Sequence, residues 1–162
     1  KANVPIAKAW RQHQVKKFYL ALSAGCAEHE TYKITQPIGL VNHPRLGTLH
    51  AATENGKLSL SFARVLQKSA DATLFNVEIK TGRPHQIRIH LASLGYPLLG
   101  DPLYGIGGLP ISEALPGDGG YFLHASRLEF LHPSSRTLLQ LTVSLPQGFK
   151  DKLSNLKIKN DL

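Results

Sequence analysis

The side chains best suited to chemistry lie close together in one stretch of the sequence, residues 80–91, which reads KTGRPHQIRIHL. Apolar residues alternate with polar ones up to Ile79, which is typical of a strand, and Pro84 suits the first position of a helix. Gly82 lies between them and lets a ligand approach the backbone closely. Free N–H groups at the start of a helix favour phosphate, so the stretch predicts an anion-binding turn. An ordinary helix with a solvated polar face is the alternative.

Three side chains of this stretch could act on a ligand. Arg88 follows Ile87, which belongs with Leu91 to the apolar face of the expected helix, so Arg88 is expected at the margin of the core, where it needs a carboxylate partner. His85, one turn earlier, can hydrogen-bond RNA or cap the helix. Arg83 lies in the turn, where a phosphate of a nucleic-acid backbone would pass.

The composition favours an anionic partner. The 162 residues hold 19 Lys and Arg against 11 Asp and Glu, a formal net charge of +8 with a pI near 9.8. RNA is such a partner, although a basic domain whose charge only aids solubility has the same composition. Cys26 is the single cysteine, which excludes an internal disulfide framework. Neither an apolar run of membrane-spanning length nor a secretory leader occurs, so we expect a cytoplasmic protein without a membrane partner.

The hydrophobic pattern predicts an α+β fold, mainly an antiparallel sheet with a few helices, in a single domain over residues 1–162. Phe18, Leu20 and Leu22 are expected to form the core-facing side of the first strand. The helix is expected to start at Pro84 and to end at Gly95. The other expected elements are strands at 15–23, 31–34, 58–62, 75–79, 128–130 and 139–145, a turn at Asn55–Gly56, loops at 42–47, 100–102 and 105–120, and a partly helical tail at 150–162.

Several segments together resemble RluA-type pseudouridine synthases. The sequences TGRPHQIRIHL at 81–91 and GYPLLGDPLYG at 95–105 are similar to that family's third motif and the loop after it. The sequence VKKFYLAL at 15–22 resembles the strand that carries the family's active-site tyrosine. The segments at 37–39, 123–125, 128–130 and 132–133 resemble further parts of the same domain, in the same order. The similarity covers nearly the whole chain.

The resemblance implies an RNA-modifying isomerase that needs no cofactor. In this reaction a uridine is swung out of structured RNA, ribosomal or transfer RNA, and its glycosidic bond is cut. The base is then rotated and rejoined through carbon to give pseudouridine. The nucleophile is an aspartate in a His-Arg-Leu-Asp sequence before the tyrosine strand, and the 162 residues contain no such sequence. The chain therefore corresponds to the C-terminal part of the catalytic domain and is expected to be inactive alone.

The resemblance also assigns roles to particular residues. Tyr19 would stack on the flipped base and assist proton removal from its ring carbon, whereas a lone strand tyrosine would otherwise be read as a core residue. Arg88 would pair with the absent aspartate and would otherwise be left unpaired. Lys17, Gly82, Arg83 and His85 would contact RNA. Independently of the resemblance, Asp101 is interpreted as the structural cap of a turn and Tyr104 as its anchor. At Tyr96 the family often has histidine.

Two other functions remain open at this point. A metal hydrolase is disfavoured because His85 and His90, five residues apart, lie about 140° apart around a helix, whereas helical metal pairs use a spacing of four residues. No metal is therefore expected. A non-catalytic RNA-binding module is the stronger alternative because the chain is basic and has no nucleophile motif. A monomer is expected in either case.

Overall fold

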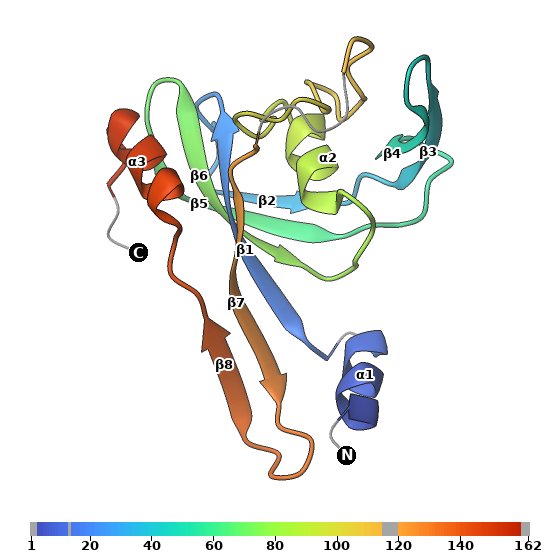
Figure 1. Ribbon diagram of the computed structural model, residues 1–162, viewed down its shortest axis with the longest axis vertical. Helices are drawn as coiled ribbons and strands as arrows, with labels where there is room; N and C mark the ends of the chain where they lie inside the picture. Colours follow the sequence, from blue (N-terminus) through green and yellow to red (C-terminus); the bar gives the residue numbers. More distant parts are fainter. Residues whose placement is uncertain (1–2, 13, 115–119, 160–162) are drawn as a thin grey trace.

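The computed structural model describes residues 3–12, 14–114 and 120–159, and within them a six-stranded antiparallel sheet is the main element. Its strand order is β2-β5-β6-β1-β7-β8, and a separate hairpin, β3–β4, extends from one side (Figure 1). The α+β class with a mainly antiparallel sheet is confirmed. The elements are α1 (Asn3–Arg11), β1 (Lys16–Ala24), β2 (Thr31–Ile34), β3 (Ile38–His43), β4 (Gly47–Ala52), β5 (Ser61–Lys68), β6 (Ala72–Ile79), α2 (Gln86–Ser93), β7 (Leu123–Leu131), β8 (Leu138–Thr142) and α3 (Gln147–Asn155).

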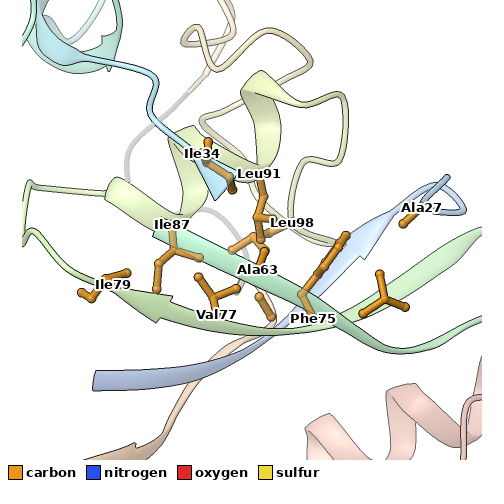
Figure 2. Packing of buried hydrophobic residues seen from close by; sticks show 11 residues of the cluster. Ala27, Ile34, Ala63, Phe75, Val77, Ile79, Ile87, Leu91 and Leu98 are labelled. Atoms are coloured by element: carbon orange, nitrogen blue, oxygen red, sulfur yellow. The ribbon is translucent and has the colours of Figure 1, made fainter. Parts of the chain in front are cut away.

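The sheet has a hydrophobic cluster on each face. On one face, Ile87 and Leu91 of α2 pack on Ala21, Val77 and other sheet residues, and Figure 2 shows both α2 side chains pointing toward the sheet. On the other face, Leu20 and Leu22 of β1 pack against α3. The sequence predicted one core-facing side for this strand. That prediction was incomplete, because successive side chains of a strand point to opposite faces and here a helix covers each of them.

Helix α2 is shorter and more deeply buried than its sequence suggests. It begins at Gln86 rather than Pro84 because His85 has a left-handed backbone, with φ of 54°. It ends before Gly95 as predicted, and Gly95 has a φ of 92°, which glycine adopts at little cost. Every residue from Gln86 to Ala92 is buried. The alternative of an ordinary helix with a solvated polar face is therefore wrong.

Two predictions for the middle of the chain need correction. The long loop expected at 42–47 is a tight hairpin turn instead: β3 and β4 pair in register as far as His43 opposite Gly47, and only residues 44–46 form the turn. There His43 Nδ1 accepts hydrogen bonds from the backbone N–H groups of Arg45 and Leu46, which stabilises the reversal. The turn at Asn55–Gly56 is confirmed, but the strand after it, β5, starts at Ser61 and continues to Lys68.

The C-terminal part follows the predicted order. Strands β7 and β8 form the expected hairpin, with Leu131 opposite Leu138. Helix α3 starts a few residues before the tail that was expected to be helical, and its Leu153 is fully buried. The loop predicted at 105–120 is irregular where it is described, and 115–119 lie outside the described residues, as do 160–162 of the tail. Within the described parts, none of the helices has the length and apolarity needed to cross a membrane.

Candidate active site

A cleft of about 220 Å³ lies where α2 meets the sheet. Tyr19 of β1 and Arg88 of α2 both line it, as do Arg83 and His85 from the turn before α2. These four residues come from two segments more than 60 positions apart in the sequence. The tertiary structure thus brings together both predicted catalytic residues and two of the four predicted RNA contacts.

Arg88 has a carboxylate partner within the chain, Asp101. Its Nε donates to Oδ2 of Asp101 at 2.7 Å and its Nη2 donates to Oδ1 at 2.6 Å, which is a bidentate ion pair. Both side chains are almost fully buried, with 8% of Arg88 and 1% of Asp101 exposed. The expectation that Arg88 is unpaired in this chain was therefore wrong. Asp101 lies 13 residues after Arg88, beyond the end of α2. No periodic pattern in the sequence indicates a contact between them.

Asp101 also has the structural role expected of it. Its Oδ1 accepts hydrogen bonds from the backbone N–H groups of Leu103 at 2.9 Å and of Tyr104 at 3.2 Å. The cap on this turn and the partner of Arg88 are thus one carboxylate. A displacement of the loop would consequently displace the arginine.

Two tyrosine rings lie against the guanidinium of Arg88. Its carbon lies 4.8 Å from the ring centroid of Tyr104 and 4.2 Å from that of Tyr121. Both distances are within cation–π range. Burial by itself would lower the pKa of Arg88, but the hydrogen bonds and charge of Asp101 outweigh it, and the pKa is raised. Nη1 is left without a hydrogen-bond partner among the described residues.

His85 is held in one tautomer by Tyr104. The Tyr104 hydroxyl donates its only proton to the carbonyl of His50 at 2.6 Å, so His85 Nδ1, 2.8 Å away, must donate to that hydroxyl. Burial lowers the pKa of His85, helped by the charge of Arg88, and this favours a neutral ring whose Nε2 is an acceptor. The side chain makes no hydrogen bond that caps α2. The capping role is therefore wrong, and contact with RNA stays a prediction.

Arg83 lies at the edge of the cleft. Its Nε and Nη2 donate to the carbonyl of Leu58 at 3.3 and 3.1 Å, which anchors the guanidinium while the residue stays partly exposed. Nη1 has no partner among the described residues. The remaining two predicted contacts, Lys17 and Gly82, lie beside each other in the adjoining part of the same face.

The comparisons with known proteins identify the family of this chain. Residues 3–93 match the family model described as RNA pseudouridylate synthase. This chain belongs to the RNA pseudouridylate synthase family. It is 48% identical over 143 residues to an uncharacterized RNA pseudouridine synthase of Synechocystis, covering 87% of this chain and 49% of the relative. It is 40% identical over 161 residues to the ribosomal large subunit pseudouridine synthase D of Nitrosomonas europaea, covering 96% and 45%.

The fold is likewise shared with solved structures. The human RNA pseudouridylate synthase domain containing 4 superposes with a TM-score of 0.70 at 22% identity, over 95% of this chain and 67% of that one. The chain spans about half the length of the curated relatives it matches.

One residue that sequence reasoning did not single out, Gln86, holds the turn of this pseudouridylate synthase chain in place. Its Nε2 donates to the carbonyl of Leu60 and to Ser61 Oγ, at 3.0 and 2.9 Å. Its Oε1 accepts from Thr81 Oγ1 at 2.8 Å and from the backbone N–H of Arg83 at 3.0 Å. The side-chain amide of Gln86 therefore uses both of its N–H donors and both acceptor positions of its oxygen. The only available signal was its place inside the motif at 81–91.

His90 extends the same buried network. Its Nδ1 accepts from Ser61 Oγ at 2.9 Å, and its Nε2 therefore donates to the carbonyl of Gln36 at 3.0 Å. The residue is fully buried, and burial lowers its pKa to about 4. A neutral ring with both nitrogens in use ties α2 to β5 and to the segment before β3. It is not disposed to bind a metal.

Proposed function

We propose that this chain is part of an enzyme that converts uridine to pseudouridine in structured RNA, either ribosomal or transfer RNA. The observation that carries the proposal is the placement of Tyr19 and Arg88 on one cleft. Such a cleft offers an aromatic face for a flipped base and a buried cation for a charged partner. Membership of the family supports the same reaction.

Tyr19 is proposed to stack on the flipped uracil. Its side chain is half-buried on the cleft wall, and burial raises the pKa of its hydroxyl. At neutral pH the phenol is therefore protonated. A protonated phenol is a poor base for removing a proton from the ring carbon, so the free chain supports stacking better than proton transfer.

Arg88 is proposed to hold the nucleophilic carboxylate with its remaining nitrogen. Asp101 occupies Nε and Nη2 and so orients the guanidinium, whereas Nη1 has no partner among the described residues. A carboxylate at Nη1 would be kept ionised by the positive charge. The aspartate of a His-Arg-Leu-Asp sequence would be that carboxylate, and it would come from outside these 162 residues.

The 162-residue chain alone is accordingly expected to form no pseudouridine. The test incubates it with ribosomal and transfer RNA that lack pseudouridine and then measures the modified nucleoside by mass spectrometry. The same chain extended upstream by its own gene sequence is the comparison. Pseudouridine formed by the unextended chain would contradict the need for an outside aspartate.

A non-catalytic RNA-binding module is the second candidate, and the high positive charge without a nucleophile motif favours it. The two functions differ in what precedes the chain in its gene. An upstream His-Arg-Leu-Asp with activity of the extended chain supports the enzyme. Its absence, together with RNA binding but no isomerisation, supports the module. The cytoplasmic location and monomeric state expected from the sequence stay predictions.

Arg83→Ala is expected to weaken RNA binding to a similar extent across sequences. A phosphate contact carries no base information, and its loss should make the salt dependence of log K shallower by roughly 0.7 to 0.9. Affinity is measured at several salt concentrations with two RNAs of unrelated sequence.

Lys33→Ala is the matched control for Arg83. Lys33 is exposed on β2, and cross-strand pairing places it on the face of Phe18, opposite to Tyr19. The Lys33→Ala substitution therefore removes one positive charge without altering the cleft. Equal salt slopes for the Arg83 variant and the unmodified chain would rule out the phosphate contact.

A further inference from the structure

Lys17 is a buried cation without a matching anion in the part of the chain that the structure describes. Only 9% of the residue is exposed, and none of the ion pairs among the described residues includes it. Burial lowers the pKa of its ammonium group, which reflects the cost of removing that charge from water. The preceding Lys16 is the opposite case, because its side chain is 60% exposed and lies 3.8 Å from Glu129.

The surroundings of the Lys17 ammonium suit an anion. Nζ lies 5.5 Å from the ring centroid of Trp10, which holds it from one side. Nζ also lies 3.8 Å from the point that a Cβ at Gly82 would occupy. The Lys17 ammonium thus lies against an uncluttered turn, and the Gly82 N–H of that turn has no hydrogen-bond partner among the described residues.

The strand sets the distance from this turn to Tyr19. Lys17 and Tyr19 are two residues apart on β1 and point to the same face, and the strand separates their Cα atoms by about 6.6–6.8 Å. Lys17 also pairs with Ile79, three positions before Gly82, so the turn lies directly beside it. A ribose separates a base from its phosphate by a comparable span. A nucleotide whose base stacks on Tyr19 can therefore place a phosphate near Lys17.

We propose that Lys17 Nζ and the Gly82 turn form a binding site for a phosphate of the RNA, adjacent to the base held on Tyr19. This inference rests on the proposed function, because it takes RNA as the ligand. We favour a phosphate over a carboxylate because it has more acceptor oxygens to share between the Lys17 ammonium and a backbone N–H of the turn. A carboxylate from another protein segment is the outcome that the experiment must separate.

The first experiment uses inorganic phosphate as the probe, without RNA. Phosphate is titrated into the 162-residue chain while NMR follows the Gly82 amide and the Lys17 side-chain Cε. Both signals are expected to shift together and to saturate. In Lys17→Met the shift of the Gly82 amide is expected to disappear, and in Lys16→Met it is expected to persist, because Lys16 points to the opposite face. No shift, or the same shift in Lys17→Met, would overturn the site and leave a carboxylate as the better occupant.

The second experiment uses RNA and separates the site from the overall function. Lys17→Met is expected to weaken RNA binding roughly tenfold at low salt, as expected for one charge-assisted contact, and Lys16→Met less than twofold. Lys17→Met is also expected to melt no lower than the unmodified chain, because it removes a buried charge that has no ion-pair partner among the described residues. Equal RNA affinity for Lys17→Met and the unmodified chain would overturn the RNA phosphate as ligand, whatever the extended chain does. If phosphate and RNA bind as expected but the extended chain isomerises nothing, the site stands and the proposed reaction fails.

Discussion

Asp101→Ala is expected to lower the free energy of unfolding by about 3–5 kcal/mol, because it leaves the guanidinium of Arg88 buried without its carboxylate. The pair is 8% and 1% exposed, so water cannot replace the lost partner without opening the loop. The backbone N–H groups of Leu103 and Tyr104 lose their acceptor as well. Urea denaturation of the 162-residue chain measures this loss.

The matched control for this prediction removes both charges. Arg88→Met combined with Asp101→Leu is expected to cost clearly less than the Asp101→Ala change, because no uncompensated charge remains inside the protein. A loss below about 1 kcal/mol for Asp101→Ala would contradict a buried, mutually dependent pair.

In the extended chain, Asp101→Asn is expected to reduce isomerisation because the guanidinium of Arg88 is then misplaced. Asp101 itself is a positioning residue.

Acid is expected to destabilise the protein through His90. The pKa of this histidine is lowered from 6.5 to about 4 in the folded chain, so the folded state binds the proton less readily than the unfolded state. Its contribution to stability is therefore fully present above pH 6.5 and is lost as the pH falls from 6.5 toward 4. A shift of this size corresponds to about 3 kcal/mol. The lowered pKa of His85 adds to the loss in the same direction.

Two measurements check the role of His90. Urea denaturation between pH 7.5 and 4 gives the pH dependence of stability, and the same series on His90→Asn should be flatter in this window. Titration of the imidazole by NMR gives the pKa directly. A value near 6.5 for His90 in the folded protein would show that protonation does not disturb the buried network with Ser61 and Gln36.

The sequence by itself determined the family, most of the strands and the end of α2. These depend on local features: alternation along β1 and β6, a glycine after the helix, and the motif at 81–91, all of which can be read without knowing what lies nearby. Tyr19 and Arg88 were identified in the same way, through the motifs that contain them. Their placement on one cleft then followed from the shared fold.

The tertiary structure alone decided how these residues are held. The pairing of Arg88 with Asp101, the Tyr121 ring over the guanidinium and the contact between His85 and Tyr104 join positions that are 13 to 33 residues apart in the sequence. The four hydrogen bonds of Gln86 likewise reach β5 and the turn. Such contacts depend on the directions in which loops and side chains meet, and residue type and spacing carry no information on that. A buried charge or amide becomes a defined site only when the folded chain brings its partners to it.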